Sequence, residues 1–498
     1  MSGFGKVLVA NRGEIALRVI RTLQEMGITS VAVASEADVA APHALAADEC
    51  CVLGPAPAAE SYLNVDALLR AVHDSGAEAV HPGYGFLSEN ADFAEMLGKA
   101  GGTFIGPAPS AMRIMGSKTA SREAMDRAGV PVVPGSPPGV TDNAGLGKAA
   151  AAMGFPVLVK ASAGGGGKGM RLVRDSSGFP SALALCRSEA KAAFSDETVY
   201  VEKYLERPRH IEVQVFGDAT GRVFALGERE CSIQRRHQKI LEESPSPGVD
   251  PGLRARLEET AVSAARAVDY QSAGTVEFLM DAEGGFYFLE MNTRLQVEHP
   301  VTEMVYGVDL VAAQVLTAAG LPLPFDPDRL SLRGHAIEAR VYAEDPAVGY
   351  LPQTGTVHDL FFPDRPGFRV DSGLRLGSEV GVHYDPLLAK VIAWGPDRKA
   401  ATRRLSAAIR ESSILGVVTN LDLLADVLDH PAWAAGEIDT GFLERHFASW
   451  SAPGALPPEV IAAASAAGAP VRGAASNRPG PPDSPWTTLG AWRPVGGS

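Results

Sequence analysis

Hydrophobic positions in the first part of the chain alternate between two periods, which predicts repeated strand–helix–strand units. Residues 6–10, a lysine followed by four apolar residues, are typical of a buried strand. Residues 14–26 place apolar side chains three and four apart, as a helix does, and residues 30–34 are again apolar. Because strands that alternate with helices form parallel sheets, we expect an α/β, Rossmann-like N-terminal domain over residues 1–115.

The pattern changes after residue 115. A helix is predicted over 118–128, and four prolines then mark a linker into a smaller unit. In that unit, strands at 156–161 and 170–173 flank a segment, 164–169, that contains five glycines. A third strand, at 199–205, leads out again. We expect residues 116–333 to form one domain whose mobile, glycine-rich lid spans 134–205.

The glycine segment has two possible readings. Gly164, Gly166 and Gly169 satisfy G-x-G-x-x-G, but a strand follows where a dinucleotide site requires a helix. A strand–glycine loop–strand unit can instead lay its backbone N–H groups over phosphates. Lys160 and Lys168 favour that reading, and a flexible hairpin without a ligand is the alternative.

A hairpin between residues 275 and 292 carries the clearest chemistry. Two strand-like runs enclose Asp281–Gly285, and a two-residue loop at Glu283 and Gly284 would place Glu277 opposite Glu290, with Asn292 on the same face. Because like charges directly opposite each other are destabilising, two carboxylates and an amide on one face favour a cation between them. Their oxygen atoms suit Mg²⁺ or Mn²⁺, although a solvent-facing sheet surface would explain them equally well.

The hairpin runs directly into a second polar segment. Arg294, Gln296, Glu298 and His299 fall within six residues at the end of an apolar strand. A strand that ends in several polar groups is typical of a functional site. Upstream, residues 235–239 form a basic cluster flanked by apolar residues, and buried cations of this kind require anions such as phosphate or bicarbonate.

Composition limits the class of protein. The chain has 498 residues, more than one core can accommodate, with 46% hydrophobic and 21% charged residues, as in ordinary globular proteins. Its net charge of -14 argues against a nucleic-acid or anionic-membrane binder. The four cysteines do not have the spacing of a metal site or of a disulfide framework, and neither a signal peptide nor an apolar membrane span is visible. We therefore expect a cytoplasmic location. The composition becomes rich in Ala, Pro and Gly over 449–498, where we expect a poorly ordered tail.

Taken together, five segments resemble the biotin carboxylase family of ATP-grasp enzymes. The resemblance extends from about residue 6 to about residue 447 and rests on motifs at 10–16, 81–90, 160–170, 230–239 and 290–303. It implies an N-terminal α/β domain, an ATP-grasp domain with a glycine-rich lid, and a C-terminal biotin carboxylase domain over 334–448. It also implies ATP- and bicarbonate-dependent carboxylation of biotin on a carrier.

The resemblance implies roles for individual residues. The residues expected at ATP are Lys118, Lys160, Gly165, Gly166, Gly167, Glu202, Lys203, Leu205, His210, Gln234 and His237. Those expected at Mg²⁺ or Mn²⁺ are Glu277, Glu290 and Asn292, in agreement with the hairpin argument. The residues expected at bicarbonate are Lys239, Arg294, Gln296, Val297 and Glu298, and Glu298 is the expected base. The expected catalytic residues are Lys239, Arg294, Glu298 and Arg340. The residues expected at biotin are Arg340 and Tyr84.

The resemblance also implies partners: a biotin carrier protein or domain, a carboxyltransferase subunit, and a homodimer or larger complex. Biotin carriers place their lysine within Ala/Val-Met-Lys-Met, a sequence that this chain lacks, whereas residues 485–493 resemble the region after the carboxylase module of longer acyl-CoA carboxylase α-subunits. We therefore expect either a longer α-subunit cut short or a stand-alone subunit. The alternatives are another ATP-grasp ligase, of the carbamoyl-phosphate-forming type, and a non-catalytic scaffold.

Overall fold

The N-terminal part forms a parallel sheet of five strands in the order β3-β2-β1-β4-β5. The computed structural model describes residues 3–137, 139–162, 170–194, 196–235 and 238–452. The strands of this sheet are β1 (Lys6–Val9), β2 (Thr29–Ser35), β3 (Glu49–Gly54), β4 (Ala79–His81) and β5 (Thr103–Phe104). The predicted parallel α/β sheet is therefore confirmed, and its strand order matches the first five strands of the 3-2-1-4-5-6 order of a Rossmann fold.

A second, antiparallel sheet of eight strands forms the centre of the remaining chain, in the order β13-β12-β9-β10-β11-β14-β21-β19. Its strands are β9 (Arg209–Gly217), β10 (Val223–Arg235), β11 (Gln238–Ser244), β12 (Ser272–Met280), β13 (Phe286–Asn292), β14 (His335–Tyr342), β19 (Phe368–Ser372) and β21 (Leu387–Gly395). This one sheet continues across the boundary expected at 333/334, because β11 pairs with β14.

The predicted small unit is a three-stranded antiparallel sheet in the order β7-β6-β8. Its strands are β6 (Val157–Ala161), β7 (Met170–Val173) and β8 (Val199–Lys203). Two helices, α7 (Asn143–Met153) and α8 (Phe179–Phe194), pack on it around a core of their own. The glycine segment 164–169, and with it the predicted mobile lid tip, lies outside the described residues.

The remaining helices and short strands complete the fold. The helices are α1 (Gly13–Glu25), α2 (Pro42–Ala46), α3 (Val65–Ser75), α4 (Ala91–Lys99), α5 (Pro109–Gly116), α6 (Lys118–Arg127), α9 (Pro251–Arg266), α10 (His299–Tyr306), α11 (Leu310–Ala318), α12 (Arg398–Glu411), α13 (Leu421–Asp429), α14 (Pro431–Ala435) and α15 (Phe442–His446). The short strands are β15 (Glu344–Asp345), β16 (Leu351–Pro352), β17 (Gly355–Thr356), β18 (Asp359–Phe361), β20 (Glu379–Val380) and β22 (Ser413–Leu415).

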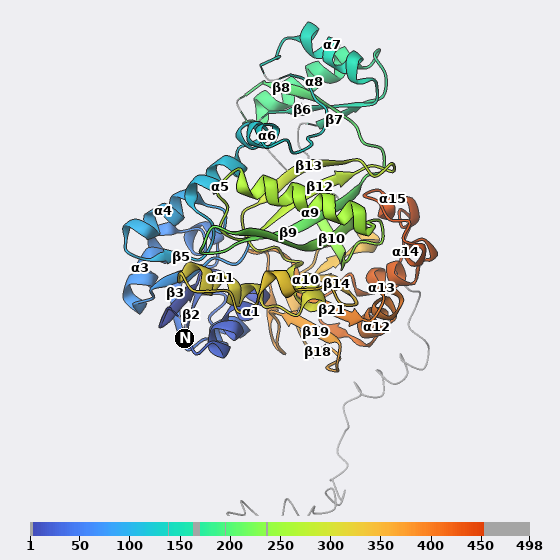
Figure 1. The fold of residues 1–498 in the computed structure, drawn as a ribbon. Helices are drawn as coiled ribbons and strands as arrows, with labels where there is room; N and C mark the ends of the chain where they lie inside the picture. The colour runs from blue at the N-terminus through green and yellow to red at the C-terminus, as the bar shows by residue number, and fades with distance from the viewer. Residues whose placement is uncertain (1–2, 138, 163–169, 195, 236–237, 453–498) are drawn as a thin grey trace, which may run out of the picture. The chain divides into compact units, whose positions relative to one another are not determined.

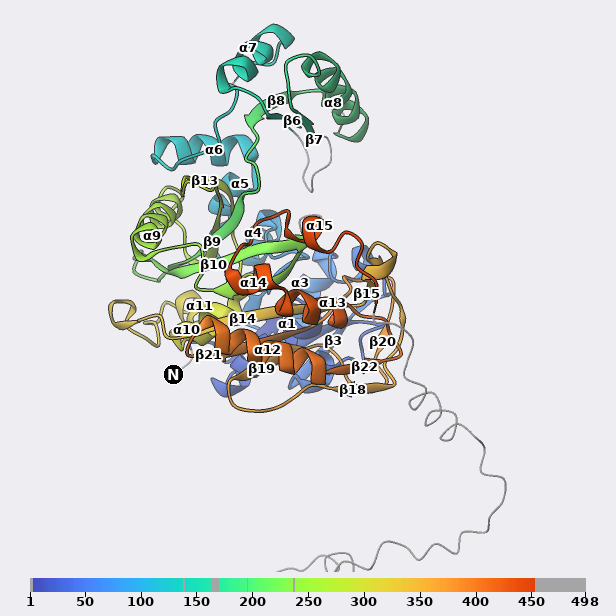
Figure 2. The same ribbon diagram turned by 90° about the vertical axis from the view of Figure 1, so that its right-hand side faces the viewer.

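Helices cover both faces of the eight-stranded sheet. Helix α9 packs on β9, β10 and β12 (Figure 1), where Ile211, Val213 and Val215 point into a core with Leu257. Helix α12 packs on one face of β14 and β21 (Figure 2). Helix α10 contacts β10, β11, β14 and β21, and a small apolar cluster joins it to the sheet. On these strands, the residues that face α10 are two apart in sequence and are largely polar.

The predicted pairing of Glu277 with Glu290 is confirmed, but the predicted two-residue loop is wrong. The N–H of Asp281 donates to the C=O of Gly285 at 2.8 Å, so the loop comprises the three residues between them. Three-residue loops of this kind use a residue in the left-handed region, here Gly284 with φ 80°. A β-bulge at Leu289 then shifts β13 by one residue and restores the register at Glu290.

Among the described residues, no single helix has the length and hydropathy of a membrane span. Helices α10 and α11 reach these limits only when joined, and they meet at an angle of 96°. Both contribute buried residues to the core clusters.

Candidate functional site

The site begins with a polar row on β9. Alternate residues of a strand point to opposite faces, so His210, Glu212 and Gln214 lie on the face away from α9. All three are buried, with Glu212 and Gln214 at 0% exposure. Buried polar groups require partners, and these come from β10, β11, β12 and α10.

Glu277 on β12 is the most heavily hydrogen-bonded carboxylate of the hairpin. Its Oε1 accepts hydrogen bonds from Lys239 Nζ at 3.0 Å, Asn292 Nδ2 at 2.9 Å and Gln296 Nε2 at 3.0 Å, while His210 Nε2 lies 2.8 Å from Oε2. Burial works to raise the pKa of Glu277, but Lys239 and His210 outweigh it and hold the pKa far below its ordinary value. Glu277 is therefore ionised at neutral pH.

Glu290, directly opposite Glu277, has a different environment. Its side chain is exposed to solvent, but the surrounding protein partly desolvates its carboxyl group. This desolvation and the charge of Glu277 raise the pKa of Glu290. Asn292 lies two residues further along β13, and its Oδ1 accepts a hydrogen bond from Arg294 Nη2 at 2.9 Å. This set of carboxylate and amide oxygens, in which the exposed side chain of Glu290 lies opposite the ionised Glu277, fits a hard divalent cation.

Lys239 links the hairpin to the sheet centre. Its ammonium group donates to Glu212 at 2.6 Å, Glu277 at 3.0 Å and Glu298 at 2.7 Å. A bulge places two residues of β11 against one of β10 beside Lys239, and bulges of this kind aim side chains at functional sites. Burial opposes the charge of Lys239, but the three carboxylates outweigh it and raise its pKa well above the ordinary value.

Glu298 joins Lys239 to Arg340. It lies immediately before α10 and is completely buried. Lys239 Nζ donates to its Oε1, and Arg340 Nη2 on β14 donates to its Oε2 at 3.0 Å. Burial favours protonation, but the charges of Lys239 and Arg340 prevail and keep the pKa of Glu298 well below its ordinary value.

The segment between the hairpin and α10 is held by its own polar groups. Arg294 donates to Gln296 Oε1 at 2.9 Å and to Glu89 Oε2 at 3.0 Å, which connects the segment to the N-terminal domain. The backbone C=O of Val297 accepts a hydrogen bond from Lys390 Nζ at 2.9 Å. The structure thus gathers the expected bicarbonate residues around one point.

The residues expected at ATP fall into two groups. His210 and Gln234 are buried in the large sheet, and His210 is hydrogen-bonded to Glu277. In the small sheet, Glu202 accepts hydrogen bonds from Lys160 at 2.5 Å and from Arg122 at 2.9 Å.

The other described residues expected at ATP lie on or just after β8 and at the start of α6. Lys203 Nζ donates to the C=O of Gly154 at 3.0 Å, Leu205 is half-buried, and Lys118 begins α6 with an exposed side chain. His237 and the glycines 165–167 lie outside the described residues.

Tyr84, expected near biotin, is half-buried in the loop after β4. Its hydroxyl donates to Glu14, and its ring lies 6.0 Å from the ammonium group of Lys390. Lys390 is in turn directly opposite Arg340 across β21 and β14. Tyr84 therefore reaches the Arg340 side of the site through Lys390.

Sequence reasoning missed several residues that hold the site together. Arg229 is completely buried and donates to Glu212, to Gln214 at 2.8 Å and to Thr302 at 2.9 Å. Lys390 and Arg122 were also missed. The alternating polar positions of β9 were a usable signal for Glu212, whereas nothing local distinguishes Lys390 from a surface lysine.

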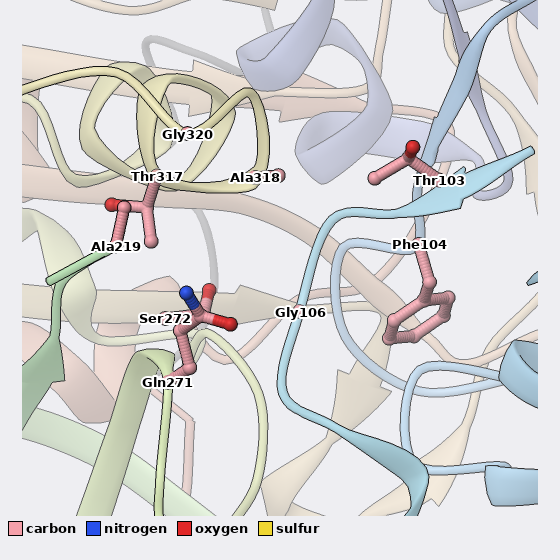
Figure 3. Close-up of a pocket in the computed structure, with 9 residues that line it drawn as sticks. All are labelled: Thr103, Phe104, Gly106, Ala219, Gln271, Ser272, Thr317, Ala318 and Gly320. Atoms are coloured by element: carbon pink, nitrogen blue, oxygen red, sulfur yellow. The ribbon is translucent and has the colours of Figure 1, made fainter. Parts of the chain in front are cut away.

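The molecule also has cavities away from this site. One of about 270 Å³ is lined by Thr103, Phe104, Gly106, Ala219, Gln271, Ser272, Thr317, Ala318 and Gly320 (Figure 3). None of these residues belongs to the cluster around Glu277 and Glu298.

Three family models match consecutive parts of the chain. The biotin carboxylase N-terminal domain matches residues 3–112, the ATP-binding domain of the carbamoyl-phosphate synthase L chain matches 117–325, and the biotin carboxylase C-terminal domain matches 338–445. The fold and the matched ATP-binding domain define an ATP-grasp protein. Because the flanking models are both those of biotin carboxylase, the chain belongs to the biotin carboxylase family.

Individual proteins agree with this assignment. The chain is 50% identical over 442 residues to the mitochondrial methylcrotonoyl-CoA carboxylase subunit alpha of Rattus norvegicus, covering 89% of this chain and 62% of that protein. It is 50% identical over 443 residues to the biotin carboxylase of Halalkalibacterium halodurans, covering 89% and 98%. The chain thus spans less than two thirds of the first relative.

A solved structure is similar over nearly the same range. It is the biotin carboxylase domain dimer of the Hydrogenobacter thermophilus 2-oxoglutarate carboxylase, in complex with MgADP, ADP and bicarbonate. Its TM-score is 0.84 at 43% identity, covering 91% of this chain and 99% of that chain.

Proposed function

We propose that this chain catalyses the ATP- and bicarbonate-dependent carboxylation of biotin held on a carrier, the first half-reaction of an acyl-CoA carboxylase. The observation that carries the proposal is the buried sequence of ion pairs from Glu277 through Lys239 and Glu298 to Arg340. It connects the hairpin that is proposed to bind a cation with the buried guanidinium group of Arg340. A phosphoryl transfer followed by a carboxylation needs these two electrostatic environments next to each other.

ATP is proposed to bind between the small sheet and the hairpin. Lys118 and Lys160 would neutralise its phosphates, and Glu202, Lys203 and Leu205 would contact its base. His210, Gln234 and His237 would lie along the ribose and phosphates, with glycines 165–167 over the phosphates. In support, Lys160 and Arg122 already meet at Glu202, so the small sheet presents paired charges that an anionic ligand can reorganise.

Glu277, Glu290 and Asn292 would hold Mg²⁺ or Mn²⁺. The bound cation would neutralise charge that develops on the transferred phosphoryl group. In support, the hydrogen bonds from Lys239, Asn292 and Gln296 fix Glu277 in an ionised state, ready to act as a ligand. Glu290 is the solvent-accessible partner across the hairpin.

Bicarbonate would occupy the centre of the cluster, with Lys239, Arg294, Gln296 and Val297 around it. Glu298 would remove its proton as the bicarbonate oxygen attacks the γ-phosphorus, giving ADP and carboxyphosphate. The depressed pKa of Glu298 in the free protein makes it a weak base, because two cations stabilise its charge. A bound anion shares those cations, which raises the pKa of Glu298 toward the value that proton transfer needs.

Carboxyphosphate would then break down to CO₂ and phosphate, and the phosphate would remove the N–H proton of biotin. The resulting enolate carries negative charge on its oxygen, which the guanidinium of Arg340 would stabilise before the ring nitrogen attacks CO₂. Tyr84 would lie on this biotin side. In support, Arg340 is buried and keeps a raised pKa, because Glu242 and Glu298 outweigh the effect of burial.

The proposed partners are a biotin carrier, as a protein or domain, and a carboxyltransferase that chooses the acyl acceptor. A homodimer or larger complex is proposed as well, and the dimer in the Hydrogenobacter thermophilus structure supports it. The proposed domains are 1–115, 116–333 with a lid over 134–205, 334–448 and a tail over 449–498. A reducing compartment such as the cytoplasm is proposed, and the four free cysteines support it.

The test is an ATPase assay with and without free biotin, combined with transfer of isotopically labelled bicarbonate to biotin. Biotin should stimulate ATP cleavage and become labelled. A carbamoyl-phosphate-forming enzyme would hydrolyse ATP with bicarbonate but ignore biotin, and a scaffold would do neither. Either of those results would overturn the proposal.

A further inference from the structure

Two buried carboxyl groups lie directly behind Arg340. Glu338 on β14 is 0% exposed, and neither of its oxygens has a hydrogen-bond partner among the described residues. Glu242 on β11 is also 0% exposed and is the register partner of Glu338. Its Oε1 accepts a hydrogen bond from Arg340 Nε, whereas its Oε2 has none from the described part of the chain.

The two carboxyl groups are close enough to interact. Side chains directly opposite each other in an antiparallel pair have Cβ atoms about 4.5–5.5 Å apart and point to the same face. Arg340 follows Glu338 by two residues and therefore shares this face as well. Three carboxyl oxygens without donors among the described residues thus lie on one buried face of the sheet.

The surrounding cations are already engaged. The charged and titratable groups around the pair are Cys231 on β10, Lys239 on β11, Arg340 and Tyr342 on β14, Lys390 on β21 and Glu298 before α10. Lys239 bonds to three other carboxylates, and Arg340 bonds to Glu242 and Glu298. Lys390 donates to Val297 and lies 3.2 Å from Glu14. None of these contacts reaches Glu338.

An ionised carboxylate without a partner is strongly unfavourable in such a place, and it normally takes up a proton instead. Burial raises the pKa of Glu338 well above its ordinary value, and it raises that of Glu242 to about 7. Two acceptors that face each other form a hydrogen bond only when one of them is protonated. Such a pair gains or loses its protons as a unit.

We propose that Glu242 and Glu338 hold one buried proton between them, with Glu338 as the acid that donates its O–H to Oε2 of Glu242. On the basis of the proposed function, we infer that the pair positions Arg340 for the step that involves biotin. The hydrogen bond from Glu338 holds Glu242 ionised against Arg340 Nε. That contact fixes the guanidinium so that its Nη2 end points toward Glu298 and the reacting groups. Glu338 is thus a positioning residue that acts through Glu242.

The proton itself can be tested by infrared difference spectroscopy, without any activity. A neutral carboxylic acid has a C=O stretching band that is distinct from that of a carboxylate and moves to lower frequency in D₂O. We expect the wild-type minus Glu338→Gln spectrum to show such a band at neutral pH and above. The exposed Glu444→Gln variant should give no neutral-acid band. A wild-type spectrum without the Glu338 band would overturn the proposal, whatever the enzyme catalyses.

The positioning role is tested by comparing two substitutions. Glu338→Gln keeps a donor toward Glu242 and should retain biotin carboxylation within about twofold, with an unchanged pH profile. Glu338→Leu removes the donor and should lower kcat for biotin carboxylation about tenfold or more. It should leave the slow, biotin-independent, bicarbonate-dependent ATPase within about twofold, since that step does not need Arg340.

The outcomes separate the two levels of the proposal. Equal loss of carboxylation in Glu338→Gln and Glu338→Leu would mean that the working enzyme needs an ionised Glu338, which overturns the shared proton. Loss of the biotin-independent ATPase in Glu338→Leu alone would mean that Glu338 does not act through Arg340, which overturns the positioning role. A wild-type chain that does not carboxylate biotin would remove the proposed function, and the spectroscopic test of the proton would still stand.

Discussion

Arg340 and Glu298 form a buried ion pair in which Nη2 of the arginine donates to Oε2 of the glutamate at 3.0 Å. Arg340 lies on a strand and Glu298 at the start of a helix, 42 residues apart in the chain. The other oxygen of Glu298 accepts a hydrogen bond from Lys239. One carboxylate therefore lies between Lys239, next to the hairpin proposed to bind the metal, and Arg340, on the proposed biotin side. This position places the proposed base at the junction of the two proposed steps.

Substitutions at the two ends of this pair should separate the two steps. Glu298→Gln removes the base and should abolish bicarbonate-dependent ATP cleavage with or without biotin, because carboxyphosphate does not form. Arg340→Ala should keep much of the biotin-independent ATPase but form no carboxybiotin, since enolate stabilisation belongs only to the second transition state. Both activities are measured on the same preparations.

The exposed Arg333→Ala, just before the same strand, provides the control and should retain both activities. If Arg340→Ala removes the biotin-independent ATPase as completely as Glu298→Gln does, Arg340 belongs instead to bicarbonate or phosphate binding.

Glu290→Gln should abolish Mg²⁺-dependent ATP cleavage while the fold persists. Glu290 is exposed and has no hydrogen bond to the described residues, so its loss removes a ligand without breaking a buried contact. The measurement is ATPase rate against Mg²⁺ concentration, with circular dichroism to check the fold. Glu283→Gln, in the exposed hairpin loop, is the matched control. Near wild-type turnover of Glu290→Gln at ordinary Mg²⁺ would contradict the metal assignment.

Arg229→Met should destabilise the protein by about 3–5 kcal/mol, because it leaves Glu212 without one of its two cations in a fully buried place. The free energy of unfolding from urea titration measures the effect. The control is Arg403→Met, on the exposed side of α12, which should change stability by less than about 0.5 kcal/mol. Equal values for the two variants would show that the buried network contributes no net stability.

The buried carboxyl of Glu14 should contribute a loss of stability as pH rises from 4.5 to about 7. Burial raises its pKa from 4.5 to about 7, despite the opposing charge of Lys390. In this window the native state keeps a proton that the unfolded chain has released, so the native state is favoured less as pH rises. Glu14→Gln removes this contribution and should shift the pH slope of the unfolding free energy upward by up to about 1.4 kcal/mol per pH unit.

Urea unfolding at several pH values checks this expectation, with Glu25→Gln on the exposed face of the same helix as control. An identical pH slope in wild type and Glu14→Gln would contradict the raised pKa.

Much of the local structure was determined by the sequence alone. The period of the hydrophobic positions was enough to predict the N-terminal strands and α1, because a strand and a helix repeat at different intervals. The pairing of Glu277 with Glu290 was predictable because a hairpin joins residues close in sequence. Even there, the three-residue loop and the bulge at Leu289 compensated for each other in a way that local pattern does not reveal.

The tertiary structure alone decided how the site is assembled. Lys239 meets Glu212, Glu277 and Glu298, which come from three separate parts of the chain. The pairing of Glu242 with Glu338 depends on the register of β11 against β14, strands about a hundred residues apart in the chain. The physical reason is that burial and charge pairing depend on which distant strands become neighbours. A glutamate at the edge of a sheet is a solvated side chain, whereas a glutamate between two central strands retains a proton.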